Sequence, residues 1–167
     1  MSDRAPATTS QGPPAGGPCI FRHATPADRD AVVELVFETL RSYGIEPDPE
    51  GLDSDVMRFG IHGDPAIADL VAEIDNRVVG SVALRDRGDG TGHISKFFVA
   101  ARVRGRGIGR ELLARAVAEA RRRNLRQLDL QTRAQFEAAV HLYESTGWKR
   151  GPHPMNVCDR TYVLSLE

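Results

Sequence analysis

The chain has 167 residues, 41% of them hydrophobic, a mean hydropathy of −0.34 and a formal net charge of −1 at pH 7. This length and composition are typical of one soluble globular domain, and a charge near zero argues against a general nucleic-acid binder. The sequence has neither an apolar run that could span a membrane nor a signal-peptide segment, so we expect a cytoplasmic protein. Its two cysteines, Cys19 and Cys158, lie far apart and favour neither a disulfide framework nor a metal site.

The N-terminal segment, residues 1–18, is rich in Ala, Gly, Pro, Ser and Thr and has no periodic apolar pattern. It predicts a disordered tail before a single domain over residues 19–167. A short strand is expected at 19–22. Thr25 and Pro26 then mark the start of a helix that ends near Gly44.

An acidic, proline-broken segment follows, with a short helix expected at 53–59. Two strands at 66–74 and 77–84, joined by a tight turn, precede a charged loop at 85–92 and a strand at 93–99. Later strands are expected at 125–132, from Trp148 and at 161–166, and one more helix carries Phe136, Ala139, Val140 and Tyr143 on one face. This order predicts an α/β protein in which a mixed sheet has helices on both faces.

A Gly/Arg-rich turn between Val99 and Arg110 links the strand at 93–99 to a helix that runs to about Arg123. Such a turn directs backbone N–H groups and the positive end of a helix toward one point, which suits a phosphate. The segment lacks the Lys-Ser/Thr end of a P-loop and the glycine spacing of a dinucleotide fingerprint. A nucleic-acid contact is the alternative, but one basic turn without interleaved aromatic residues does not favour it.

Two sequence blocks resemble those of the GCN5-related N-acetyltransferase (GNAT) superfamily. Arg104, Gly107 and Gly109 fill the pattern R/Q-x-x-G-x-G/A, and residues 138–148 resemble the block A-x-x-L-Y-E-x-x-G-F. Residues 128–132 are similar to the family's L-x-L-x-T strand. The resemblance covers the chain from about Ile20 onward. It implies a GNAT-like fold with a mostly antiparallel sheet, and acetyl-CoA as co-substrate for acetyl transfer to a primary amine by direct attack in a ternary complex.

The resemblance also implies where the cofactor binds. Backbone groups of Phe98 and Val99 would hold the pantetheine arm. The pyrophosphate would meet the turn formed by Arg104, Gly105, Arg106, Gly107, Ile108, Gly109 and Arg110. Arg133 stands where relatives often carry Asn; we interpret it as a phosphate contact, with an ordinary surface arginine as the alternative.

The implied catalytic residues are Tyr143 and His93. Tyr143 occupies the position of the family's general acid, although a buried core tyrosine would show the same pattern. His93 stands where many relatives carry a Glu base; it could accept a proton or be a solvated histidine beside a Gly-rich turn.

The acceptor stays open between a small-molecule amine and a protein amine, and a homodimer is possible. Glu46, Asp48, Glu50, Asp53 and Asp55 suggest a loop that attracts a small cationic amine, or simply a solvated acidic loop. The missing Glu base leaves a non-catalytic acyl-CoA-binding domain as an alternative function.

Overall fold

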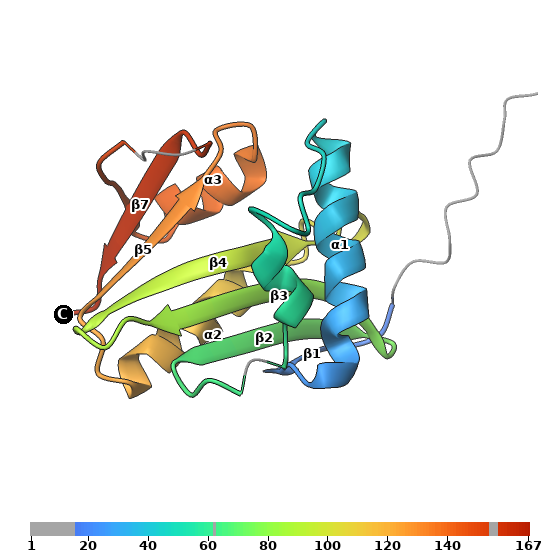
Figure 1. The fold of residues 1–167 in the computed structure, drawn as a ribbon, viewed down its shortest axis with the longest axis horizontal. Helices are drawn as coiled ribbons and strands as arrows, with labels where there is room; N and C mark the ends of the chain where they lie inside the picture. The colour runs from blue at the N-terminus through green and yellow to red at the C-terminus, as the bar shows by residue number, and fades with distance from the viewer. Residues whose placement is uncertain (1–15, 62, 154–156) are drawn as a thin grey trace, which may run out of the picture.

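A computed structural model describes residues 16–61, 63–153 and 157–167, so most of the predicted tail lies outside the described residues (Figure 1). The described strands form one seven-stranded sheet in the order β1-β2-β3-β4-β5-β7-β6. Within it β4 and β5 run parallel, and the other five neighbouring pairs are antiparallel. The predicted mixed, mostly antiparallel α/β fold is therefore confirmed.

The elements follow the chain order that the sequence predicts. The strands are β1 (Cys19–His23), β2 (Ile67–Ile74), β3 (Arg77–Asp86), β4 (Thr91–Val99), β5 (Gln127–Thr132), β6 (Lys149–Arg150) and β7 (Arg160–Ser165). The α-helices are α1 (Arg29–Ser42), α2 (Ile108–Arg122) and α3 (Glu137–Ser145), and 3₁₀ turns cover Pro26–Asp28, Ser54–Arg58 and Ala101–Val103. Among the described residues, no helix combines the length and the apolar character needed to cross a membrane.

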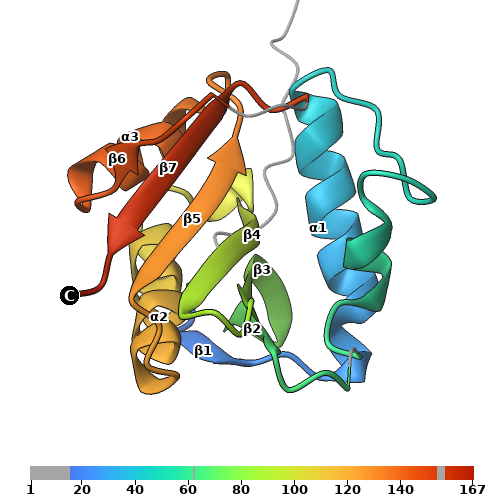
Figure 2. The same ribbon diagram turned by 60° about the vertical axis from the view of Figure 1, so that its left-hand side comes forward.

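Helices cover both faces of the sheet, with α1 on one side and α2 and α3 on the other (Figure 2). Successive side chains of a strand point to opposite faces. Val71 and Ala83 accordingly pack with α1, whereas their neighbours Ala72 and Leu84 join the larger core beneath α2. The alternation of side chains thus produces two hydrophobic layers from one sheet.

The hairpin between β3 and β4 is longer than the sequence predicts. Arg85 pairs with His93 and Asp86 with Gly92, so both ends of the charged segment predicted as a loop over 85–92 are strand, and the loop is confined to residues 87–90. The apolar alternation that predicts a strand stops before the ends of β3 and β4, because Arg85, Asp86 and Thr91 at these ends are polar. His93 therefore lies within β4 rather than at its first residue.

A β-bulge distorts β4 next to the cavity described below. Ser81 pairs with Phe98 and Ala83 with Ser95, which places one extra residue in β4. Lys96 takes up this residue with a left-handed φ of 52°, and its carbonyl oxygen accepts a 2.7 Å hydrogen bond from the buried Ser81 hydroxyl. The parallel pairing of β4 with β5 ends at Ile94. Beyond that residue the two strands separate and leave space between them.

The start of α1 is held by Asp28. Its carboxylate accepts a 2.7 Å hydrogen bond from the Thr25 N–H and bonds of 2.7 and 2.9 Å from the Arg22 guanidinium. Arg22 also reaches Glu73 on β2 at 2.7 Å. The bonds from Arg22 hold the pKa of Asp28 below its usual range against the opposing effect of burial. Asp28 thereby fastens the first helix to the edge of the sheet.

Replacing Asp28 by Asn is expected to lower the free energy of unfolding at pH 7 by about 2–4 kcal/mol, because it removes the ionised carboxylate that binds Arg22 through two hydrogen bonds and leaves Arg22 with its bond to Glu73. A carboxylate with a lowered pKa stabilises the fold above its ordinary pKa, and this contribution is lost as pH falls below that value. The gap from wild type, measured by urea denaturation, should therefore shrink toward pH 3. Asp30→Asn, at an exposed site on the same helix, is the control, and a gap independent of pH would contradict this role.

Candidate active site

A cavity of about 710 Å³ opens where β4 and β5 separate. Its walls come from β4, the end of β5, the start of α2, α3, the end of α1 and the loop that follows α1. The cavity runs from the Gly/Arg turn to that loop. Of the predicted site residues, it takes in His93, Phe98, Val99, Arg104, Gly105, Gly107, Ile108, Gly109, Arg110, Arg133 and Tyr143.

The Gly/Arg turn forms one end of the cavity with an open, left-handed backbone. Gly105 and Gly107 have φ values of 79° and 78°, and a Cβ at either position would meet no protein atom within 4 Å. The first helical bond of α2 runs from the Glu111 N–H to the Gly107 carbonyl oxygen at 3.1 Å. The N–H groups of residues 107–110 precede that bond and have no acceptor within the helix. Together with the positive end of the helix dipole, they suit an anion.

Gly109 has a different role from its two neighbours. A Cβ there would lie 3.3 Å from Phe97 Cζ and 3.4 Å from Val99 Cγ2. The missing side chain lets the first turn of α2 approach β4 closely. Close packing between α2 and β4 therefore requires a glycine at position 109. At positions 105 and 107 the left-handed backbone conformation favours glycine.

The arginines of the turn divide between the cavity and the protein edge. Arg104 lines the cavity and donates from Nε to the Val99 carbonyl oxygen at 3.2 Å, and Arg110 also lines it. Arg106 does not line it, because its guanidinium lies toward the N-terminal segment, 3.5 Å from the Gly17 carbonyl oxygen. A phosphate role for the Arg106 side chain therefore lacks geometric support, although its backbone belongs to the turn.

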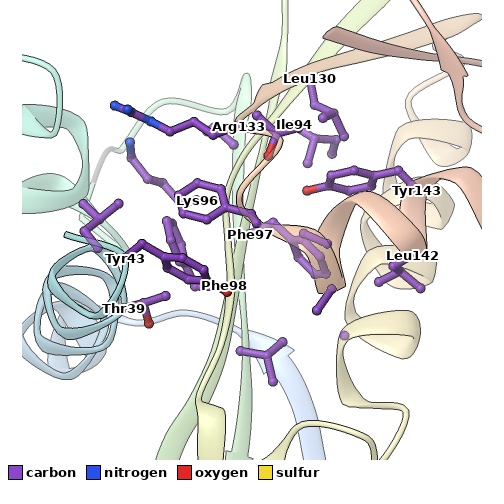
Figure 3. Close-up of a pocket in the computed structure, with 18 of the residues that line it drawn as sticks. Thr39, Tyr43, Ile94, Lys96, Phe97, Phe98, Leu130, Arg133, Leu142 and Tyr143 are labelled. Carbon is purple, nitrogen blue, oxygen red and sulfur yellow. The ribbon is translucent and has the colours of Figure 1, made fainter. Parts of the chain in front are cut away.

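Tyr143 is a core residue that also lines the cavity. Its ring is 4% exposed and packs against the rings of Phe97, Trp148 and Tyr162 at centroid distances of 5.9, 5.9 and 5.5 Å. Its hydroxyl points from α3 toward the middle of β4 (Figure 3), and no described residue hydrogen-bonds to it. Burial, with a smaller effect from Tyr162, raises the pKa of Tyr143 above its usual range. The ring is part of the core, and its protonated hydroxyl faces the cavity.

His93 forms a hydrogen-bonded network with two residues that the sequence analysis missed, Asp129 and Arg87. It lies opposite Asp129 in the parallel β4–β5 pair, and its Nδ1 is 2.6 Å from Asp129 Oδ1. Arg87 donates to the same carboxylate. Burial alone would raise the pKa of Asp129, but the bonds from Arg87 and His93 hold it below its usual range. An ionised Asp129 would keep the proton of a neutral imidazole on Nδ1 and leave Nε2 as an acceptor.

The signal for Asp129 was present in the alternation of residues 128–130. Leu128 and Leu130 are buried in the core, so the residue between them must face the other side of β5. Its partner depends on the β4–β5 register, which sequence alone does not supply.

Lys96 and Arg133 lie at the other end of the cavity. Figure 3 shows the Arg133 guanidinium and the Lys96 amine both extended toward the α1 side and away from α2. Burial raises the pKa of the Cys158 thiol, and both cations lower it. Lys96 Nζ is 3.0 Å from Asp55 Oδ1 and 4.0 Å from Asp53 Oδ1. This placement separates Arg133 from the Gly/Arg turn, so the geometry does not favour the phosphate contact that we predicted for it.

The acidic segment contributes four carboxylates to the cavity wall, from Glu46, Asp48, Asp53 and Asp55, while Glu50 is not part of it. Glu46 pairs with Arg41 at 3.6 Å, and both Asp53 and Asp55 face Lys96. Three of the four are thus partly neutralised by cations of this chain. The segment is less able to attract a cationic amine than its composition suggests.

The comparisons with known proteins agree with this geometry. The profile of the acetyltransferase (GNAT) family matches residues 32–148, and the chain belongs to this family. Over 126 residues it is 35% identical to an IAA acetyltransferase of Azospirillum brasilense, covering 74% of this chain and 81% of that protein.

Solved structures of low sequence identity share the fold. A GNAT-family acetyltransferase from Staphylococcus aureus Mu50 matches with a TM-score of 0.83 at 17% identity. The match covers 90% of this chain and 100% of that one. The PaiA N-acetyltransferase of Thermoplasma acidophilum, solved in complex with coenzyme A, matches with a TM-score of 0.73 at 16% identity, over 89% of this chain and 99% of that one.

Proposed function

We propose that this protein is an N-acetyltransferase that moves an acetyl group from acetyl-CoA to a primary amine in a ternary complex. The observation that carries the proposal is the cavity itself. It joins an anion-binding glycine turn, the edge of β4 that β5 leaves free, and the Tyr143 hydroxyl. Family membership and the coenzyme A complex of the Thermoplasma protein support it.

The chain offers separate contacts for the two parts of coenzyme A. The N–H groups at the start of α2 suit the pyrophosphate, with Arg104 and Arg110 supplying positive charge. Among the described strands, none pairs with β4 on the β5 side from Ser95 onward, so Phe98 and Val99 can offer backbone groups to the amide-bearing pantetheine arm. The thioester would then lie near Tyr143.

Two residues of the cavity can move the protons that the reaction requires. His93 Nε2 takes a proton from the ammonium form of the acceptor, directly or through water, and the amine nitrogen attacks the thioester carbonyl carbon. The C–S bond then breaks, Tyr143 gives its proton to the departing sulfur, and the second proton of the former amine nitrogen passes to the tyrosinate, which restores the phenol. Burial raises the pKa of Tyr143 and so keeps the phenol protonated and able to donate before the C–S bond breaks.

A direct attack is favoured over an acyl-enzyme because of the state of Cys158. This thiol lines the cavity, but burial raises its pKa above the usual range, even though nearby Arg133 lowers it. A thiol in its neutral form is a weak nucleophile. Initial rates with both substrates varied should therefore give intersecting rather than parallel double-reciprocal lines.

The activity itself is tested by incubating the protein with acetyl-CoA and a panel of primary amines. Release of free thiol and formation of N-acetylated product, detected by mass spectrometry, are both expected. Tight binding of acetyl-CoA without product from any amine would instead support the non-catalytic acyl-CoA-binding alternative.

Replacing Gly107 by Ala is expected to weaken acetyl-CoA binding by about tenfold or more. A Cβ at φ of 78° strains the backbone by roughly 1–2 kcal/mol and projects into the open space of the turn. Isothermal titration calorimetry would measure the dissociation constant. Gly88→Ala is the matched control, because Gly88 has a φ of 80°, open space around it and no place in the cavity wall. Wild-type affinity in Gly107→Ala would move the pyrophosphate away from this turn.

A further inference from the structure

We propose that the acceptor amine also carries a carboxylate, which Arg133 binds, and that its body is apolar. The inference rests on the proposed acetyl transfer and specifies the acceptor of that same site. Arg133 lines the cavity, is half-buried, and has no ion-pair or hydrogen-bond partner for its side chain among the described residues. A guanidinium in that position offers its forked donors to a ligand.

At the end of the cavity away from the Gly/Arg turn, Arg133 is available to bind an anionic ligand. Lys96 extends in the same direction (Figure 3), but its amine is already engaged with Asp55 and, at a longer distance, with Asp53. None of the described carboxylates lies within 4.0 Å of the Arg133 guanidinium. A planar carboxylate matches the guanidinium in geometry and charge, and can accept two parallel hydrogen bonds.

The backbone on both sides of Arg133 is fixed. The Ala134 N–H donates to Asp159 Oδ1 at 2.7 Å, and the Asp159 N–H donates to the Thr132 carbonyl oxygen at 3.2 Å. The Phe136 N–H in turn donates to the Arg133 carbonyl oxygen at 3.0 Å. These hydrogen bonds hold the backbone of the turn that carries Arg133. Less conformational freedom is therefore lost when a ligand binds to the guanidinium.

The apolar residues of the cavity wall indicate the character of the rest of the acceptor. Tyr43 and Phe136 meet edge to face at 4.8 Å in the cavity wall. Leu52 and Val157 line the same cavity and are 65% and 55% exposed, so their apolar surfaces are accessible to a ligand there. These four residues offer an apolar surface. An amino acid with an aromatic or large aliphatic side chain combines the required amine, carboxylate and apolar body.

The test compares pairs of acceptors that differ only in the carboxylate. Phenylalanine and phenethylamine form one pair, and leucine and isoamylamine the other. For the wild-type protein we expect a higher kcat/KM for the carboxylate-bearing member of at least one pair. Arg133→Gln should lower this preference by about 10–100-fold, mainly through KM, as loss of a charge-assisted bond predicts. Arg133→Lys should retain part of it.

Arg77→Gln is the matched control, since it removes the same charge from an exposed site outside the cavity wall. It should leave the preference unchanged. Two results would overturn the proposal and assign Arg133 to cofactor binding. One is an equal fall in kcat/KM for both members of a pair in Arg133→Gln, and the other is a loss of acetyl-CoA affinity in that variant.

A binding measurement separates this inference from the proposed function. Thermal shifts of the coenzyme A-saturated protein are measured with N-acetylphenylalanine and with N-acetylphenethylamine. If N-acetylphenylalanine stabilises the wild-type protein and Arg133→Gln abolishes this stabilisation, the inference is supported even if no amine is acetylated. Acetyl transfer without carboxylate preference would overturn the inference and leave the proposed function standing. No transfer and no carboxylate-dependent binding would overturn both.

Discussion

Replacing Tyr143 by Phe is expected to lower kcat by about 10²–10⁴-fold while acetyl-CoA affinity stays near the wild-type value. The substitution removes only the hydroxyl that faces the cavity, so the ring contacts with Phe97 and Trp148 remain. Because burial raises the pKa of Tyr143, the phenol stays protonated through neutral and mildly basic pH. Deprotonation of Tyr143 should therefore cause no fall in rate between pH 7 and pH 9. Steady-state kinetics and calorimetry on the same preparations measure both effects.

Tyr162→Phe provides the matched control for this experiment. Tyr162 is also buried, and its ring packs on that of Tyr143, but its hydroxyl donates to Glu144 at 2.6 Å and does not line the cavity. Loss of that hydroxyl should affect stability more than turnover. If Tyr143→Phe turned over at the wild-type rate, Tyr143 would be a core residue and the proton on sulfur would come from elsewhere.

The sequence predicts the order of elements because its periodic signals are local. Apolar alternation marks β2 and β3, a 3.6-residue period marks α2, and Thr25 and Pro26 mark the start of the first helix. The ends of β3 and β4 were misplaced where charged residues form strand, because pairing between strands overrides composition there. The bulge at Lys96 has no local signature, since it depends on the register against β3.

The site divides in the same way. Motif spacing located the Gly/Arg turn, the β4 edge and Tyr143, all of which line one cavity. It could not tell which arginines face that cavity, because Arg104, Arg106 and Arg133 look equivalent as residue types. Their directions follow from the tertiary structure: Arg106 turns to Gly17, and Arg133 extends toward the α1 side. The partner of His93 likewise emerges only when β4 and β5 lie side by side.

That partnership predicts the second large effect. Replacing His93 by Gln should lower kcat by about 10²–10⁴-fold at neutral pH, because glutamine cannot accept the proton of the attacking ammonium. Acetyl-CoA affinity should stay near the wild-type value, because the substitution changes the acceptor side of the reaction. Steady-state kinetics at saturating acetyl-CoA, together with calorimetry on the same preparation, distinguish a base from a residue that only shapes the cavity wall.

Asp129→Asn tests how His93 is held. The lowered pKa of Asp129 means that the carboxylate is ionised above the ordinary Asp range, and its support is lost only as pH falls through and below that range. At neutral pH we therefore expect the full effect of the substitution, a fall in kcat of about 10–100-fold, since an amide can present the wrong group to Nδ1. His141→Gln, at an exposed position of the same cavity wall, should leave kcat near the wild-type value. A wild-type kcat in His93→Gln would assign the base to another group of the cavity.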